Sequence, residues 1–366
     1  MTDAAFAPLR IVSMGGGSGL ATLLRGLKRY TKLVTAPLEI TAVVTVTDDG
    51  GSSGRLRREF DVLPPGDIRN CMVALSEDEA LLSRLFQCRF VGRGSLHGHS
   101  FGNLFLTAMT HLTGDFAQAV KLSSEVLAVA GRIYPCTASK VVLEATLANG
   151  RKVRGETRIS RSNGKICSVE LRPHGAEPLP ETLAAIAQAD LITLGPGSLY
   201  TSVIPNLLVE GVSKAIADSP ALKAYFVNLM TQPGETTDLR ASDHVAAILR
   251  HCGPRKRTLS FARGERNAKA AFPGISSASC AMLDVCVVNN RPFSRRALAK
   301  YRAGGAQPVE ADVGAIERMG ISVLATDLLR LSGRRVEEKI RHDAGALAAV
   351  AVDLAQQGRR LKRKRT

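Results

Sequence analysis

LRIVSMGGGSGLATLLRGLKRY, residues Leu9–Tyr30, carries the clearest indication of the fold. The apolar run Leu9–Met14 predicts a buried strand, and the glycines of Gly15–Gly19 predict a tight turn. Leucines that recur on one face predict a helix over Leu20–Tyr30, and a second apolar run predicts a strand over Leu38–Thr47. A strand, a turn, a helix and a second strand are typical of the start of a doubly wound, mostly parallel sheet.

The same alternation of predicted strands and helices returns in the second half of the chain, after a segment of different composition. Residues 132–172 alternate β-branched residues with glycines and charges, which predicts a small antiparallel β insert. We therefore expect a single α/β domain over residues 1–355 that contains this insert. Further helices are expected at Asp67–Ser76, Glu79–Cys88, Phe101–His111, Phe116–Val129, Glu181–Gln188, Ser242–Arg250, Phe293–Tyr301 and Asp343–Gln356, and strands at Ala189–Leu194, Ala224–Leu229, Leu283–Val288 and Ile321–Ala325.

The amino-acid composition argues against several classes of function. The chain has 366 residues, no Trp and 4% aromatic residues, which argues against nucleic-acid binding by base stacking. The seven cysteines form no C-x-x-C pair, so neither a zinc site nor a disulfide framework is indicated. No segment reaches the roughly 18 apolar residues of a membrane helix. We therefore expect a cytoplasmic protein.

The net charge of +16 is concentrated in two segments. One lies at residues 250–269, and the other is the lysine- and arginine-rich end of the chain. We expect residues 356–366 to form a disordered basic tail, because short charge runs are usually solvated. Weak contact of this tail with nucleic acid or an anionic membrane surface stays open.

The segment Thr45–Cys71, TVTDDGGSSGRLRREFDVLPPGDIRNC, is the richest in candidate chemistry. It begins at the end of a predicted strand, where open α/β sheets bind ligands. Asp48 could accept hydrogen bonds from a ribose, or Asp48 and Asp49 could hold Mg²⁺ beside phosphate. The sequence does not separate these roles.

Two further segments repeat this pattern of polar, glycine- or amide-rich residues after a strand. They are Gly195–Ser198 (GPGS) and Asn228–Gln232 (NLMTQ). Parallel strands would bring them to one crevice with Gly15–Gly19, a glycine-rich turn of the kind that binds phosphate at a helix start. A nucleotide with an attached group would fill such a crevice.

The two histidines of LHGHSFGN, His97 and His99, have no third metal ligand at recognisable spacing. We expect His99 and Ser100 to cap the helix that starts at Phe101, although His99 or Asn103 could still face the ligand. No Ser-His-Asp or Cys-His set stands out, so covalent catalysis has no support.

The motifs, taken in order, resemble the YvcK-type gluconeogenesis factors, in the superfamily of CofD, the 2-phospho-L-lactate transferase. The matching pieces are GGGSGLATLLRGL, the Thr45–Cys71 segment, GHSFGNLFL, TGDFAQAV, ADLITLGPGSLYTSVIPNLLV, NLMTQPGET, ASDHVAAIL and DVCVVNN. Ser18 stands where the family usually has Thr, which keeps the hydroxyl. Residues 255–269 follow no family pattern, so ligand contacts cannot be transferred there.

The resemblance implies a Rossmann-like, CofD-like fold and two alternative functions. The first is a regulatory factor that binds UDP-N-acetylglucosamine or UDP-glucose, needs no cofactor, and links gluconeogenic carbon use to cell-wall synthesis and cell shape. The second is a Mg²⁺-dependent transferase, since CofD moves a phospholactyl group from a guanosine diphosphate-linked donor to a deazaflavin. A homodimer is open in both cases.

The candidate residues follow from both lines of reasoning. Asp48 and Asp49 are the candidates for catalysis and for a metal. The expected ligand-binding residues are Gly15, Gly16, Gly17, Ser18, Gly19, Asp48, Gly50, Gly51, Ser52, Ser53, Arg55, Asp67, Asn70, His99, Asn103, Gly195, Gly197, Ser198, Tyr200, Asn206 and Asn228.

Overall fold

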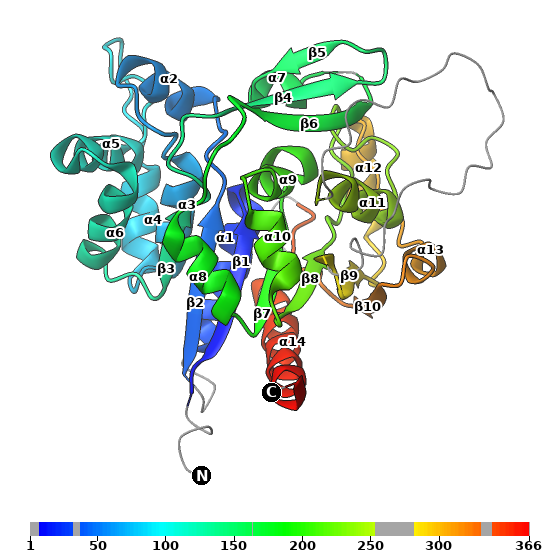
Figure 1. Ribbon diagram of the computed structural model, residues 1–366. Helices are drawn as coiled ribbons and strands as arrows, with labels where there is room; N and C mark the ends of the chain where they lie inside the picture. Colours follow the sequence, from blue (N-terminus) through cyan, green and yellow to red (C-terminus); the bar gives the residue numbers. More distant parts are fainter. Residues whose placement is uncertain (1–6, 32–36, 163, 253–281, 331–338, 366) are drawn as a thin grey trace.

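The computed structural model describes residues 7–31, 37–162, 164–252, 282–330 and 339–365 (Figure 1). Its main sheet is parallel throughout these residues. In spatial order the strands are β10 (Ser322–Thr326), β9 (Val285–Asn289), β8 (Leu222–Phe226), β7 (Leu191–Leu194), β1 (Leu9–Gly15), β2 (Leu38–Val44) and β3 (Arg132–Pro135). The chain starts at β1, builds outwards to β3, and returns on the other side of β1 with β7. This is the doubly wound order, and it confirms the α/β prediction.

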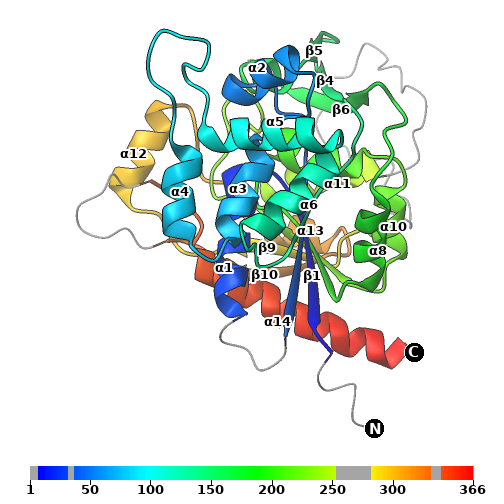
Figure 2. The same cartoon turned by 90° about the vertical axis from the view of Figure 1, so that its left-hand side faces the viewer.

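Helices cover both faces of this sheet (Figure 2). One face carries α1 (Gly17–Tyr30), α3 (Gly66–Leu75) and α14 (Ala344–Arg365). The other carries α8 (Pro180–Gln188), α9 (Ile204–Leu207) and α10 (Val212–Asp218). The central strands are therefore buried on both sides, which explains why β1 and β2 are apolar runs rather than alternating ones.

Four of the remaining helices begin where a side chain accepts a hydrogen bond from a free backbone N–H. Asp78, Ser100, Asp115 and Ser294 each cap a helix in this way. These helices are α4 (Glu79–Gln87), α5 (Phe101–Thr113), α6 (Phe116–Val126) and α12 (Arg295–Ala303). No side-chain cap from the described residues is present in α2 (Gly51–Glu59) or α13 (Val313–Glu317), whereas in α11 (Ala241–Cys252) the first-turn N–H of Ser242 donates to Asp312 Oδ1 at 2.9 Å.

The antiparallel insert exists but is shorter than expected. It contains β4 (Val142–Leu147), β5 (Lys152–Arg154), the short helix α7 (Glu156–Ser160) and β6 (Ile166–Arg172), with the strands in the order β5-β4-β6. The expected range of 132–172 was wrong at its start, because β3 pairs in parallel with β2 at the edge of the main sheet. An edge strand buries alternate residues, so its pattern resembles that of an antiparallel strand.

The expected disordered tail is also corrected. Residues 356–365 continue α14 to Arg365. Gly358, just beyond the end of the helix expected over Asp343–Gln356, lies against the start of β7, and a Cβ at this position would overlap the carbonyl oxygen of Asp190. The glycine therefore serves close packing rather than termination. The basic residues 255–269 lie outside the described part of the chain. Among the described residues, no helix is long and apolar enough to cross a membrane.

Candidate functional site

The two glycine-rich turns lie together at the switch point between β1 and β7. Gly17 (φ 63°) and Gly195 (φ 73°) adopt the left-handed conformation that favours glycine. Gly19 approaches the second turn so closely that a Cβ would overlap the carbonyl oxygen of Pro196 and lie 3.0 Å from the nitrogen of Gly197. Hence the two turns form one continuous backbone surface.

A cavity of about 310 Å³ opens above this surface. Several residues expected at the site line it: Gly16, Gly17, Ser18, Gly19, Gly197, Ser198 and Asn228. The lining also includes Gln232, from the expected NLMTQ segment, and Thr22, Ser202, Tyr301, Arg341 and His342, which were not among the expected ligand-binding residues. Thr22 and Ser202 do lie in the matching pieces GGGSGLATLLRGL and ADLITLGPGSLYTSVIPNLLV, shortly after the two glycine turns. Arg341 and His342 precede α14, far along the chain, and no spacing links them to the turns.

Side-chain amides form one wall of this cavity. Asn228 Oδ1 accepts a hydrogen bond from the backbone N–H of Gly197 at 3.3 Å. Its Nδ2 donates to Gln232 Oε1 at 3.5 Å, and Gln232 Nε2 donates to Ser198 Oγ at 2.8 Å. These contacts fix the orientation of both amides and leave each with further hydrogen-bonding capacity.

The adjacent carboxylates Asp48 and Asp49 point to different partners. Asp48 Oδ1 accepts the backbone N–H of Gly50 at 2.8 Å. Asp49 Oδ1 accepts both the N–H and the hydroxyl of Thr157 in α7, at 2.8 Å and 2.7 Å. Within the described residues, no three His, Cys, Asp or Glu side chains form a group that could hold a metal ion. A protein-only Mg²⁺ site at Asp48 and Asp49 therefore does not fit this donor set.

Three carboxyl groups in this region have raised pKa values, and the charge of Asp48 acts on two of them. Burial, and secondly the charge of Asp48, raise the pKa of Asp67 to about 6, and the backbone N–H of Gly17 donates to Asp67. The same two causes raise the pKa of Glu156 well above its ordinary value. Burial raises the pKa of Glu235 to about 7, although the N–H groups of Tyr200 and Thr201 donate to it. Sequence reasoning found Asp67 but not the two glutamates.

Several other expected residues hold the turns in place instead of lining the cavity. Asn206 donates to the carbonyl oxygen of Gly15 at 3.3 Å and to that of Ser202 at 2.8 Å. Tyr200 is 2% exposed and lies in one turn of π-helix, η1 (Leu199–Val203). Gly15 itself ends β1.

A buried polar network accounts for most of the rest. His99 Nδ1 hydrogen-bonds Ser52 Oγ at 2.9 Å, and Asn103 donates to Ser52 and Ser53 at 3.1 Å and 3.5 Å. Ser100, not His99, caps α5. The guanidinium groups in this region contact the network too: Arg69 donates to Ser100, Asn103 and Asn70, and Arg55 to the carbonyl oxygen of His97.

The comparisons with known proteins agree with this architecture. The sequence profile of 2-phospho-L-lactate transferase CofD matches residues 11–329. The gluconeogenesis factor of Bacillus subtilis (strain 168) is 42% identical over 348 residues, 95% of this chain and 98% of that protein. The gluconeogenesis factor of Halalkalibacterium halodurans is 44% identical over 337 residues, 90% and 95% of the two chains.

A solved structure shares the fold. The crystal structure of a protein from Bacillus halodurans superposes with a TM-score of 0.82 at 42% sequence identity, and covers 94% of this chain and 99% of its own. The profile match, the two relatives and this structure each extend over most of the sequence. The chain belongs to the CofD family, alongside the gluconeogenesis factors.

Proposed function

We propose that this protein is a regulatory factor that binds a nucleotide sugar, UDP-N-acetylglucosamine or UDP-glucose, without turning it over. The observation that carries the proposal is the cavity at the switch point of the sheet, where open α/β sheets bind ligands. By analogy with relatives named gluconeogenesis factors, its role in the cytoplasm would be to link gluconeogenic carbon use to cell-wall synthesis and cell shape.

The diphosphate would lie against the first glycine turn. The N–H of Gly17 donates to Asp67, but the other N–H groups of the first turn and the positive end of the macrodipole of the 14-residue helix α1 favour an anion there. Arg341 adds a positive charge to the lining, whereas no Asp or Glu from the described residues lines the cavity. The charge balance therefore favours a bound anion.

The base would lie against the amide wall. An amide presents a donor and an acceptor side by side, as does the imide edge of uracil. Asn228 and Gln232 can therefore pair with that edge, while Ser198 and Ser202 are within the same lining to receive the ribose or the sugar. Selectivity for uridine over guanosine would come from this wall.

Calorimetry with the purified full-length chain tests the proposal. UDP-N-acetylglucosamine should bind saturably with and without Mg²⁺, GDP and NAD⁺ should bind at least about 10-fold more weakly, and the sugar nucleotide should be recovered unchanged. Sustained conversion of the ligand, or no uridine-selective binding, would overturn the proposal.

A transferase is the second candidate, and the carboxyl groups near Asp48 favour it. Groups with perturbed pKa values gather at catalytic sites, and the carboxyl groups of Asp67 and Glu156 are such groups. In transfer from a nucleotide diphosphate, the protein mainly positions groups and neutralises charge, so no nucleophilic triad is needed. Mg²⁺ would then be held chiefly by the phosphates, with Asp48 as one protein ligand.

The transferase is tested separately. Purified protein would be incubated with a lactyl-diphosphoguanosine donor, a deazaflavin acceptor and Mg²⁺, and the acceptor analysed by mass spectrometry. A phospholactyl adduct lost in Asp48→Asn would establish transfer, and an unmodified acceptor together with tight uridine nucleotide binding would exclude it.

A further inference from the structure

A second cavity, of about 450 Å³, lies between α2 and the β insert. Figures 1 and 2 both show α2 beside strand β4 of the insert, and the hydrogen bonds from Thr157 to Asp49 join α7 to the segment just before α2. None of the residues lining this cavity lines the cavity above the glycine turns. The two cavities are therefore separate, with no lining residue in common.

Arginines dominate the second cavity. Arg58 comes from α2, and Arg154, Arg158 and Arg161 come from the insert. Across the described part of the chain, none of these four guanidinium groups makes an ion pair or donates a hydrogen bond, whereas that of Arg172 on the same insert pairs with Glu144 and Glu170.

The charge of this arginine cavity is not balanced by the protein. Its one carboxylate, Asp49, already accepts two hydrogen bonds from Thr157. Four guanidinium groups around one space repel each other, even where solvent screens them. An anion in the cavity would remove that repulsion.

The backbone adds donors at the base of the cavity. Gly50 and Gly51 line it at the start of the nine-residue helix α2, which has no side-chain cap, although the N–H of Gly50 itself already donates to Asp48. Gly51 (φ 45°) has nothing within 4 Å of the place where a Cβ would be. Its side of the helix start therefore faces open space, and the positive end of the helix dipole points there.

We propose that the arginine cavity binds a small phosphorylated anion that is separate from the nucleotide sugar. Guanidinium groups match phosphate oxygens with two parallel hydrogen bonds, and they remain charged at any physiological pH. The arginines converge on one concave space between α2 and α7 instead of forming a track along the surface, which suits a compact anion rather than a nucleic-acid backbone.

Calorimetry with inorganic pyrophosphate tests this site in the full-length protein. We expect saturable binding, and we expect Arg154→Ala with Arg158→Ala to raise the Kd at least about 10-fold. The matched control is Arg151→Ala with Lys165→Ala, which removes the same charge from exposed positions of the same insert outside the cavity. This control should leave the Kd within about twofold.

The outcomes separate this proposal from the nucleotide-sugar proposal. Pyrophosphate binding lost in Arg154→Ala/Arg158→Ala, with UDP-N-acetylglucosamine binding unchanged or absent in all proteins, supports the arginine cavity. Equal weakening by both double variants would mean a general charge effect, and pyrophosphate binding that is absent or that survives in Arg154→Ala/Arg158→Ala would place no anion there. Either result overturns the proposal.

Discussion

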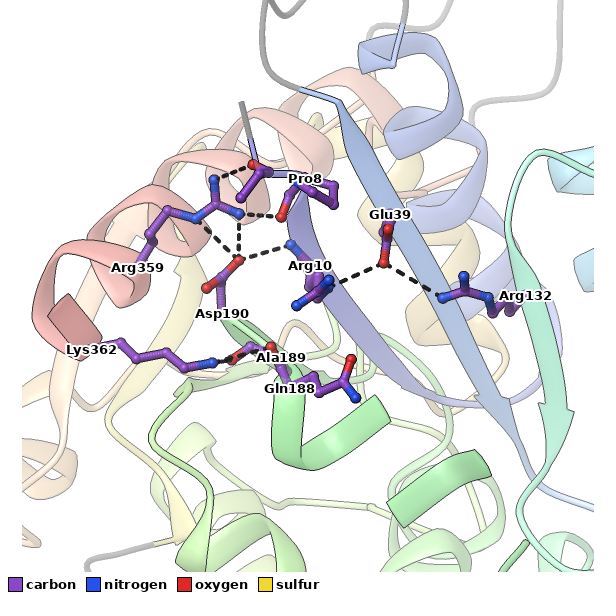
Figure 3. Close-up of polar contacts among 10 residues, drawn as sticks. Pro8, Arg10, Glu39, Arg132, Gln188, Ala189, Asp190, Arg359 and Lys362 are labelled. Atoms are coloured by element: carbon purple, nitrogen blue, oxygen red, sulfur yellow. Dashed lines mark hydrogen bonds and ion pairs between the residues drawn. The ribbon is translucent and has the colours of Figure 1, made fainter. Parts of the chain in front are cut away.

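The guanidinium of Arg359 binds the carboxylate of Asp190, which lies 169 residues earlier in the chain, at 2.7 Å and 3.3 Å (Figure 3). Arg359 also donates to the carbonyl oxygens of Ala7 and Pro8, and the backbone N–H of Arg10 donates to the same carboxylate at 2.9 Å. One side chain from the basic end of the chain thus joins α14 to the starts of β1 and β7.

Arg359→Ala should lower the free energy of unfolding by about 2 kcal/mol, because it leaves the carboxylate of Asp190 without its cation. That side chain is 8% exposed and keeps only the N–H of Arg10. Arg360→Ala, at an exposed neighbouring position, should be close to neutral. Urea denaturation compares the two, and equal midpoints would show that the ion pair contributes no stability.

The end of the chain shows why charge patterning alone misleads. Six of its residues are Lys or Arg, a composition typical of a solvated tail. However, Arg359 faces Asp190, and Lys362 donates to the carbonyl oxygens of Gln188 and Ala189 at 3.2 Å and 3.3 Å (Figure 3). A charge run is structural when long-range partners exist, and a sequence does not reveal such partners.

The residues of the candidate site likewise fall into those that the sequence could predict and those that only tertiary packing brings together. The glycine turns could be predicted, because each follows an apolar strand and parallel strands end at one edge of a sheet. Glu156 and Glu235 could not: Glu156 lies in the β insert, and Glu235, although it lies within the NLMTQPGET piece, follows no spacing that marks it as a site residue. Glu156 approaches Asp48 through the position of the insert, and Glu235 approaches Tyr200 through a loop. Tertiary packing alone creates both relationships.

Asn228→Asp should weaken binding of UDP-N-acetylglucosamine by about 10- to 100-fold. The change replaces an amide donor on the cavity wall with a carboxylate, which repels the diphosphate and cannot donate to a uracil oxygen. Asn290→Asp is the matched control, because Asn290 is exposed and lies outside the cavity. Calorimetry measures both variants, and an unchanged Kd for Asn228→Asp would remove the amide wall from the ligand site.

Glu235→Gln should flatten the pH dependence of stability between about pH 5 and pH 8. Burial raises the pKa of Glu235 to about 7, so the folded state holds a proton that the unfolded state releases above its ordinary pKa of 4.5. Stability from this group is present below pH 4.5 and is lost as the pH rises towards 7, by up to about 3 kcal/mol. Gln keeps the oxygen that accepts the N–H groups of Tyr200 and Thr201.

Urea denaturation of both proteins at several pH values isolates this effect. Burial lowers the pKa values of His244, His251 and His342 to about 4, which costs stability as the pH falls and acts in the opposite direction. These histidines are common to the wild type and the variant, so the difference between the two profiles reports Glu235. Parallel profiles would show that Glu235 is ionised in the folded protein throughout this range.

Gly19→Ala should destabilise the protein by about 2 kcal/mol or more and abolish nucleotide binding, although Ala is the better helix former by about 1 kcal/mol. Gly19 lies in the first turn of α1, and a Cβ there overlaps the carbonyl oxygen of Pro196, which is backbone and cannot rotate away. The two glycine turns would have to separate, and the surface that receives the diphosphate would open. Gly94→Ala is the control, because no atom lies within 4 Å of its added Cβ. Thermal unfolding and calorimetry measure both effects, and a Gly19→Ala protein that binds UDP-N-acetylglucosamine as tightly as Gly94→Ala would mean that contact between the turns is not required for the site.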